Sequence, residues 1–123
     1  MTVVLVLVGG AVGAPLRYLT DLFVQARHDS VLPWGTLTVN VVGSLLLGGL
    51  ASAVVIAGAP AWLLTLAGTG FCGALTTFST FGFETVRLLE DGSWLEALTN
   101  MAVSLIVGMA AVAAGWALVQ AVT

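Results

Sequence analysis

Charge is scarce in this sequence, and lysine is absent from it. Charged residues make up 7% of the 123 residues, against about 25% in ordinary soluble domains. Residues 30–83 and 97–123 contain none. A small domain exposes much of its surface, so it cannot hide uncharged stretches of this length in a soluble core. The composition therefore excludes a soluble globular domain, a disordered chain and a nucleic-acid binder, which would need a basic patch.

Cysteine and histidine are nearly absent as well. Cys72 is the only cysteine and His28 the only histidine, so the sequence offers neither an intrachain disulfide nor a metal cluster of these residues. We interpret Cys72 as a small buried residue and His28 as a solvated loop residue. Because no nucleophile is paired with a base, the chain is predicted not to be an enzyme.

Long apolar runs, by contrast, dominate the chain. Hydrophobic residues account for 59% of it, and the mean hydropathy is +1.13. A membrane-spanning helix needs about 20 mainly apolar residues, so the length accommodates four spans and leaves no loops for a fifth. Alternating strands of about ten residues, typical of a membrane β-barrel, are absent. We predict an all-α membrane protein whose residues 1–123 form a single four-helix transmembrane subunit. The expected spans are 2–24, 35–57, 62–89 and 94–121.

The third predicted span is the least regular of the four. It is longer than one straight crossing needs, and it contains Gly68, Gly70 and Gly73 before a run of hydroxyl and phenylalanine residues at 76–81. We expect a break at 70–73 that divides the span into two half-helices. Carbonyl groups freed by such a break need a new partner, and Na⁺ is one candidate. The glycines also spell G-x-G-x-x-G, but an apolar span is not the strand–turn–helix context of a nucleotide site.

Uncharged polar residues at membrane depth are the candidates for function. Asn40 offers an amide, and positions 76, 77, 79 and 80 offer hydroxyls, which are costly in hydrocarbon unless they are paired or line a path. The hydroxyls could simply bond back to helix carbonyls. Phe78 and Phe81 could be ordinary lipid-facing rings, or their positive edges could face an anion. Donors without full charge suit a path that binds a small anion and still releases it.

Four stretches of the sequence resemble the Fluc (CrcB) family of fluoride ion channels. They are Gly-Gly-Ala-Val-Gly-Ala-Pro-Leu-Arg-Tyr at 9–18, Gly-Thr-Leu-Thr-Val-Asn at 35–40, Gly-Phe-Cys-Gly-Ala-Leu-Thr-Thr-Phe-Ser-Thr-Phe at 70–81, and Glu84. Together with length and span count, the resemblance covers nearly the whole chain. The stretch at 70–81 is the most diagnostic of the four.

This resemblance implies a dual-topology homodimer of two antiparallel subunits in the inner (plasma) membrane, surrounded by lipid. Two fluoride pathways would run along the dimer interface and let cytoplasmic fluoride leave passively. The implied ion-pathway residues are Asn40, Phe78, Phe81, Ser79, Thr80 and Ser104. Arg17 and Glu84 would lie in vestibules, and backbone carbonyls of Gly73 and Thr76 from both subunits would hold a central structural Na⁺.

Two other functions remain open at this point. A small proton-coupled drug exporter also has four spans and dual topology, but it needs a membrane-embedded carboxylate, and the centres of these spans have none. A structural subunit without transport activity would leave Asn40 and the hydroxyl cluster unexplained. Orientation is weakly specified, because Arg27 and Arg87 are a small positive bias for one side of the membrane.

Overall fold

Four helices long and apolar enough to cross a membrane make up the computed structural model, which describes residues 1–27 and 33–123. They are α1 (Thr2–Gln25), α2 (Trp34–Val55), a composite third span (Ala61–Glu90) and α6 (Trp94–Val122). The predicted four-span, all-helical architecture is confirmed, and each end lies within two residues of its expected position. His28 and most of the first connection lie outside the described residues.

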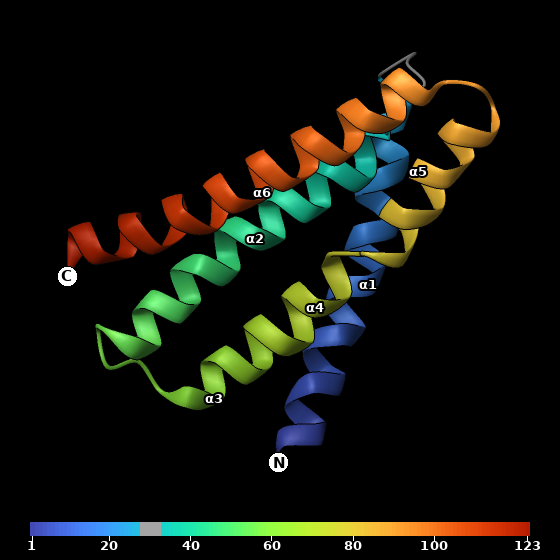
Figure 1. Cartoon of the computed structure of the whole chain (residues 1–123). Coiled ribbons are helices and arrows are strands. Elements are labelled where there is room, and N and C mark those ends of the chain that lie inside the picture. Colours follow the sequence, from blue (N-terminus) through green and yellow to red (C-terminus); the bar gives the residue numbers. More distant parts are fainter. Residues whose placement is uncertain (28–32) are drawn as a thin grey trace.

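Helices α2 and α6 form the most extensive helix pair, running side by side along most of their lengths (Figure 1). Small residues allow this close approach: a Cβ at Gly115 would collide with the carbonyl oxygen of Leu45, and one at Gly48 with that of Val112. Without a hydrophobic driving force between helices in lipid, such close contact is a main source of helix association.

Helix α1 packs instead on the first half of the third span. Gly9 and Gly13 are buried there, and a Cβ on either would strike the backbone at Leu66 or Phe71. Gly70 meets the same helix, since its Cβ would lie 2.9 Å from the carbonyl oxygen of Val6. Gly9, Gly13 and Gly70 are therefore contact residues between the two backbones.

The third span consists of four helical pieces: α3 (Ala61–Leu63), the π-helix η1 (Leu64–Cys72), α4 (Gly73–Leu75) and α5 (Ser79–Glu90). Residues 76–78 are not helical, and Thr76 is extended, with φ −79° and ψ 159°. The predicted break therefore exists, but its predicted position at 70–73 is wrong. Those residues stay helical, with Gly70 in contact with α1, and the backbone leaves the helix three residues later, at Thr76.

The exterior of the subunit is apolar on most sides. Large side chains on α1 and α6, such as Leu7 (65% exposed) and Ile106 (69% exposed), have no cover within the chain. Few apolar side chains are buried, and Val39 and Cys72 are the largest of those that are fully enclosed. A surface of this kind is suited to lipid or to another membrane-embedded chain.

Both chain termini and the turn between α2 and α3 lie at the same end of the molecule, as an even number of spans requires (Figure 1). The turns themselves depend on glycine: Gly58 and Gly92 have φ of 75° and 79°, a region that other residues rarely adopt. Gly92 thus marks the third connection, as predicted.

Candidate functional site

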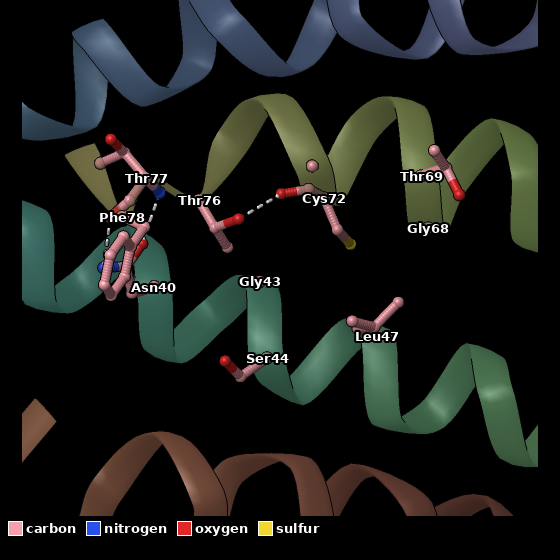
Figure 2. Close-up of a pocket in the computed structure, with 11 residues that line it drawn as sticks. Asn40, Gly43, Ser44, Leu47, Gly68, Thr69, Cys72, Thr76, Thr77 and Phe78 are labelled. Carbon is pink, nitrogen blue, oxygen red and sulfur yellow. Dashed lines mark hydrogen bonds between the residues drawn. The ribbon is translucent and has the colours of Figure 1, made fainter. Parts of the chain in front are cut away.

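The break in the third span is held by the side-chain amide of Asn40 on α2. Its Nδ2 donates to the carbonyl oxygen of Thr77 at 3.0 Å, and its Oδ1 accepts the Thr77 N–H at 2.7 Å (Figure 2). Two backbone groups that lost their helical partners are thereby satisfied by one side chain. Since an amide nitrogen carries two hydrogens, Asn40 keeps one N–H for another acceptor.

The Thr77 hydroxyl provides a hydrogen-bond partner for a backbone N–H in the first turn of α5. It accepts the backbone N–H of Thr80 at 3.1 Å, in the manner of a helix cap. The same hydroxyl donates to the Thr80 hydroxyl at 3.0 Å and lies 3.4 Å from that of Ser79. Because Thr80 accepts this bond, its own hydroxyl hydrogen is available to a further acceptor. Three hydroxyls are thus gathered at one helix end, where the partial charge of the helix is positive.

The backbone break also frees carbonyl oxygens. In the part of the chain that the structure describes, none of the backbone hydrogen bonds outside the helices is accepted by the carbonyls of Gly73 or Thr76. The Thr76 hydroxyl is not similarly free, since it bonds back to the carbonyl of Cys72 at 2.8 Å (Figure 2). For this residue the simpler interpretation, a hydroxyl that bonds to its own helix, is correct.

A groove of about 480 Å³ lies between α2 and the first half of the third span. In Figure 2 the lining residues come from both helices, and Phe78 and Asn40 lie at one end of the groove. The lining residues are Asn40, Gly43, Ser44, Leu47, Gly68, Thr69, Cys72, Gly73, Thr76, Thr77 and Phe78. Small, hydroxyl and amide groups alternate here with apolar ones, at the depth of the break.

The two candidate phenylalanines are a ring pair. The centroids of Phe78 and Phe81 are 5.8 Å apart, with the ring planes inclined at 43°. Phe78 is 83% exposed within the single chain, an extreme value for a phenylalanine that lines a groove. The rings are tilted and not stacked face to face, and an anion would be bound by a ring edge, which is positive.

The vestibule candidates occupy two separate hollows. Arg17 lines a hollow of about 190 Å³ together with Asp21, Thr36, Thr77 and Thr80, so the structure brings a positive charge near the hydroxyl cluster. The other hollow, of about 280 Å³, contains the second candidate, Glu84, and is lined also by Gln25, Pro33, Arg87, Leu88, Asp91 and Ser93.

Glu84 is also tied to α2, because its carboxylate accepts a hydrogen bond from the Thr36 hydroxyl. Thr36 is buried and was not among the predicted site residues. Its position one helical turn before Asn40 on α2 is the signal that could have identified it, since residues i and i+4 share a face.

Ser104 lies apart from the groove, in a second polar cluster between α5 and α6. Its hydroxyl approaches Asn100 Oδ1 at 3.4 Å, Asn100 Nδ2 donates to the Thr85 hydroxyl at 3.0 Å, and Thr85 donates to the carbonyl of Phe81 at 2.8 Å. The shared face of Asn100 and Ser104 is as expected from their spacing. Thr85 was not identified from the sequence, because one threonine in an apolar helix carries no pattern.

Fold and site together define a small multi-pass membrane protein with a polar, hydrogen-bonded break inside its third span. Comparison with known families identifies which one: residues 4–116 match the model of the CrcB-like protein, Camphor Resistance (CrcB) family. The chain belongs to this family, as the sequence motifs indicated.

Relatives of known name agree with this assignment. The chain is 57% identical to the fluoride-specific ion channel FluC 1 of Nocardia farcinica over 123 residues, covering 100% of this chain and 84% of the relative. It is 54% identical to FluC 1 of Frankia casuarinae, with 99% and 98% covered. A FluC 2 of Mycobacterium bovis is 47% identical, with 86% and 81% covered. These relatives are channels, which supports the prediction that the chain is not an enzyme.

Proposed function

We propose that this protein is a fluoride-selective channel that passively exports cytoplasmic fluoride across the plasma membrane. The observation that carries the proposal is the break at 76–78, where Asn40 holds the backbone through two hydrogen bonds. Beside it lie the hydroxyl cluster, of which Ser79 is exposed, and the phenylalanine pair, of which Phe78 is exposed. The names of the relatives supply the ion. Export has a physical basis in acid accumulation: HF crosses the membrane, ionises inside, and F⁻ then needs a path out.

The pathway we propose binds the anion without a full positive charge. Asn40, Ser79, Thr80 and the edges of Phe78 and Phe81 would replace part of the hydration shell, and Ser104 would contribute from α6. Arg17 would raise the local anion concentration at the entrance through its field. Glu84, which is bonded to Thr36 of the same hollow, would lie near that end as well. Weak, repeated donors allow the ion to leave as readily as it enters.

The functional unit we propose is an antiparallel homodimer with two such pathways. The exposed Phe78 and the open groove beside it are features of an incomplete site that a second copy would cover. Such a pair requires each chain to insert in both orientations, and the weak charge bias permits this.

A central Na⁺ would join the two copies. The free carbonyl oxygens of Gly73 and Thr76 fit a hard cation that prefers oxygen ligands. Among the described residues no group of three or more His, Cys, Asp or Glu could bind a metal, so backbone oxygen is the available ligand type. Na⁺ would there link the helix break of one subunit to the same break in the other subunit.

Reconstitution tests the proposed function directly. Liposomes that contain the purified protein are loaded with fluoride and chloride. They are expected to release fluoride rapidly once a cation ionophore prevents the build-up of a membrane potential, while chloride stays inside. Ion-selective electrodes follow both ions. Liposomes without protein are the control, and fluoride retention by the protein-containing vesicles would refute the proposal.

A further inference from the structure

Helix α5 carries three of the six proposed pathway residues, Ser79, Thr80 and Phe81. Among the described residues it packs chiefly on α6, with smaller contact to α2. Its only buried residues are Thr85 and Leu88, one turn apart on the same face. Leu88 makes apolar contact, which tolerates small sliding and rotation. Thr85 is therefore the buried position on α5 where a directional bond can define its register against α6, as the bond between Glu84 and Thr36 ties it to α2.

That directional bond comes from Asn100 of α6. The amide nitrogen donates to the Thr85 hydroxyl at 3.0 Å, and both side chains are closed off, at 5% and 7% exposed. The single hydrogen of the Thr85 hydroxyl is used as well, because it is donated to the carbonyl oxygen of Phe81 at 2.8 Å. Two hydrogen bonds thus connect Asn100, through the Thr85 hydroxyl, to the backbone of Phe81, a proposed pathway residue.

We propose that Asn100 and Thr85 are positioning residues that set the rotation and height of α5 against α6, and through them the place of Phe81 and Thr80 in the ion path. This inference rests on the proposed fluoride channel function. Neither residue contacts the ion. Buried amide–hydroxyl bonds are well suited to this task, since breaking one leaves a donor unpaired in a low-dielectric interior.

Substitution of Thr85 separates positioning from assembly. Thr85→Val keeps the shape of the side chain and removes the hydroxyl, so Asn100 loses its acceptor. We expect fluoride efflux per reconstituted dimer to fall at least about fivefold, the range expected for a buried unpaired donor, with fluoride-over-chloride selectivity reduced. Thr85→Ser, which restores the hydroxyl, is expected to stay within about twofold of the parent protein.

Asn100→Leu gives the second arm of the test. If the two side chains act through one bond, the double variant Thr85→Val/Asn100→Leu should be no worse than the more impaired single variant. Thr99→Val is the matched control, because the exposed Thr99 hydroxyl on the same helix bonds only to the carbonyl of Leu95. It is expected to leave flux unchanged.

The outcomes distinguish this inference from the proposed function. A parent protein without fluoride efflux refutes the channel itself. A conducting parent with unchanged efflux and selectivity in Thr85→Val, or with fully additive losses in the double variant, overturns the positioning role. Loss of dimer on gel filtration with normal flux per remaining dimer would also overturn it, since that is a purely structural effect.

Discussion

At the scale of single residues, the side-chain amide of Asn40 has two roles, one structural and one in the proposed pathway. It holds Thr77 through two hydrogen bonds, and its second amide hydrogen is left for the groove. The sequence predicted a polar residue at this depth, because an asparagine in an apolar span is costly without a partner. It could not identify the partner, since Thr77 lies far along the chain and bonds through its backbone, which every residue possesses.

Replacement of Asn40 by leucine should therefore destabilise the break as well as the pathway. The N–H and carbonyl of Thr77 would both lose their partner, at about 1–3 kcal/mol for each unpaired group. A lower midpoint of thermal unfolding in detergent is expected. Ser44→Ala is the control for stability, because Ser44 lies one turn further along the same groove. Its side chain makes no hydrogen bond within the part of the chain that the structure describes. Equal midpoints for both variants would contradict the clamp.

A second prediction for a single residue concerns the aromatic ring of Phe81, which a substitution can remove. Phe81→Ile keeps an apolar side chain but loses the polarised ring edge, so fluoride efflux from liposomes is expected to drop by about tenfold or more, a loss of roughly 1.4 kcal/mol. Phe83→Ile on the same helix is the control, since Phe83 is 67% exposed and outside the ring pair. Gel filtration should show the same assembly for both variants, and undiminished efflux in Phe81→Ile would exclude the ring from the path.

At the scale of the elements, the spans were predictable and the break was not fully so. Helix lengths follow from the apolar runs between Gly58, Gly92 and the charged connections, and each end was placed closely. The glycines at 70 and 73 suggested a break at their own position. Gly70 instead makes close contact with α1, and the break comes where the backbone of Thr77 is hydrogen-bonded by Asn40. Which of these two uses a glycine serves depends on packing that no local pattern contains.

Helix contacts give a paired prediction at the same scale. Gly115→Ala should weaken the α2–α6 pair, because the added Cβ would collide with the backbone at Leu45. Gly108→Ala on the same helix should be neutral or slightly stabilising, since nothing lies within 4 Å of its Cβ and alanine favours helix over glycine. Thermal unfolding in detergent compares the two. Similar midpoints would show that the close approach at Gly115 is relaxed by small shifts.

At the scale of the whole molecule, the proposed Na⁺ bridge makes assembly depend on an ion. Removal of Na⁺, with a large organic cation as replacement, is expected to shift the protein toward monomer or to slow fluoride efflux. The physical reason is that two sets of freed carbonyls would then face each other without a cation. Gel filtration and liposome efflux across a series of Na⁺ concentrations measure both effects, and indifference to Na⁺ over the whole series would argue against the bridge.

The placement of both termini at one end has a consequence for building the pair from a single gene. In an antiparallel dimer, the last residue of one copy and the first residue of the other face opposite sides of the membrane. A simple loop cannot join them. A covalently fused tandem would need an odd number of additional membrane crossings in its linker, and a flexible linker of any length without one would force the copies parallel. Parallel and antiparallel assemblies can therefore be told apart by which linker yields an active fusion.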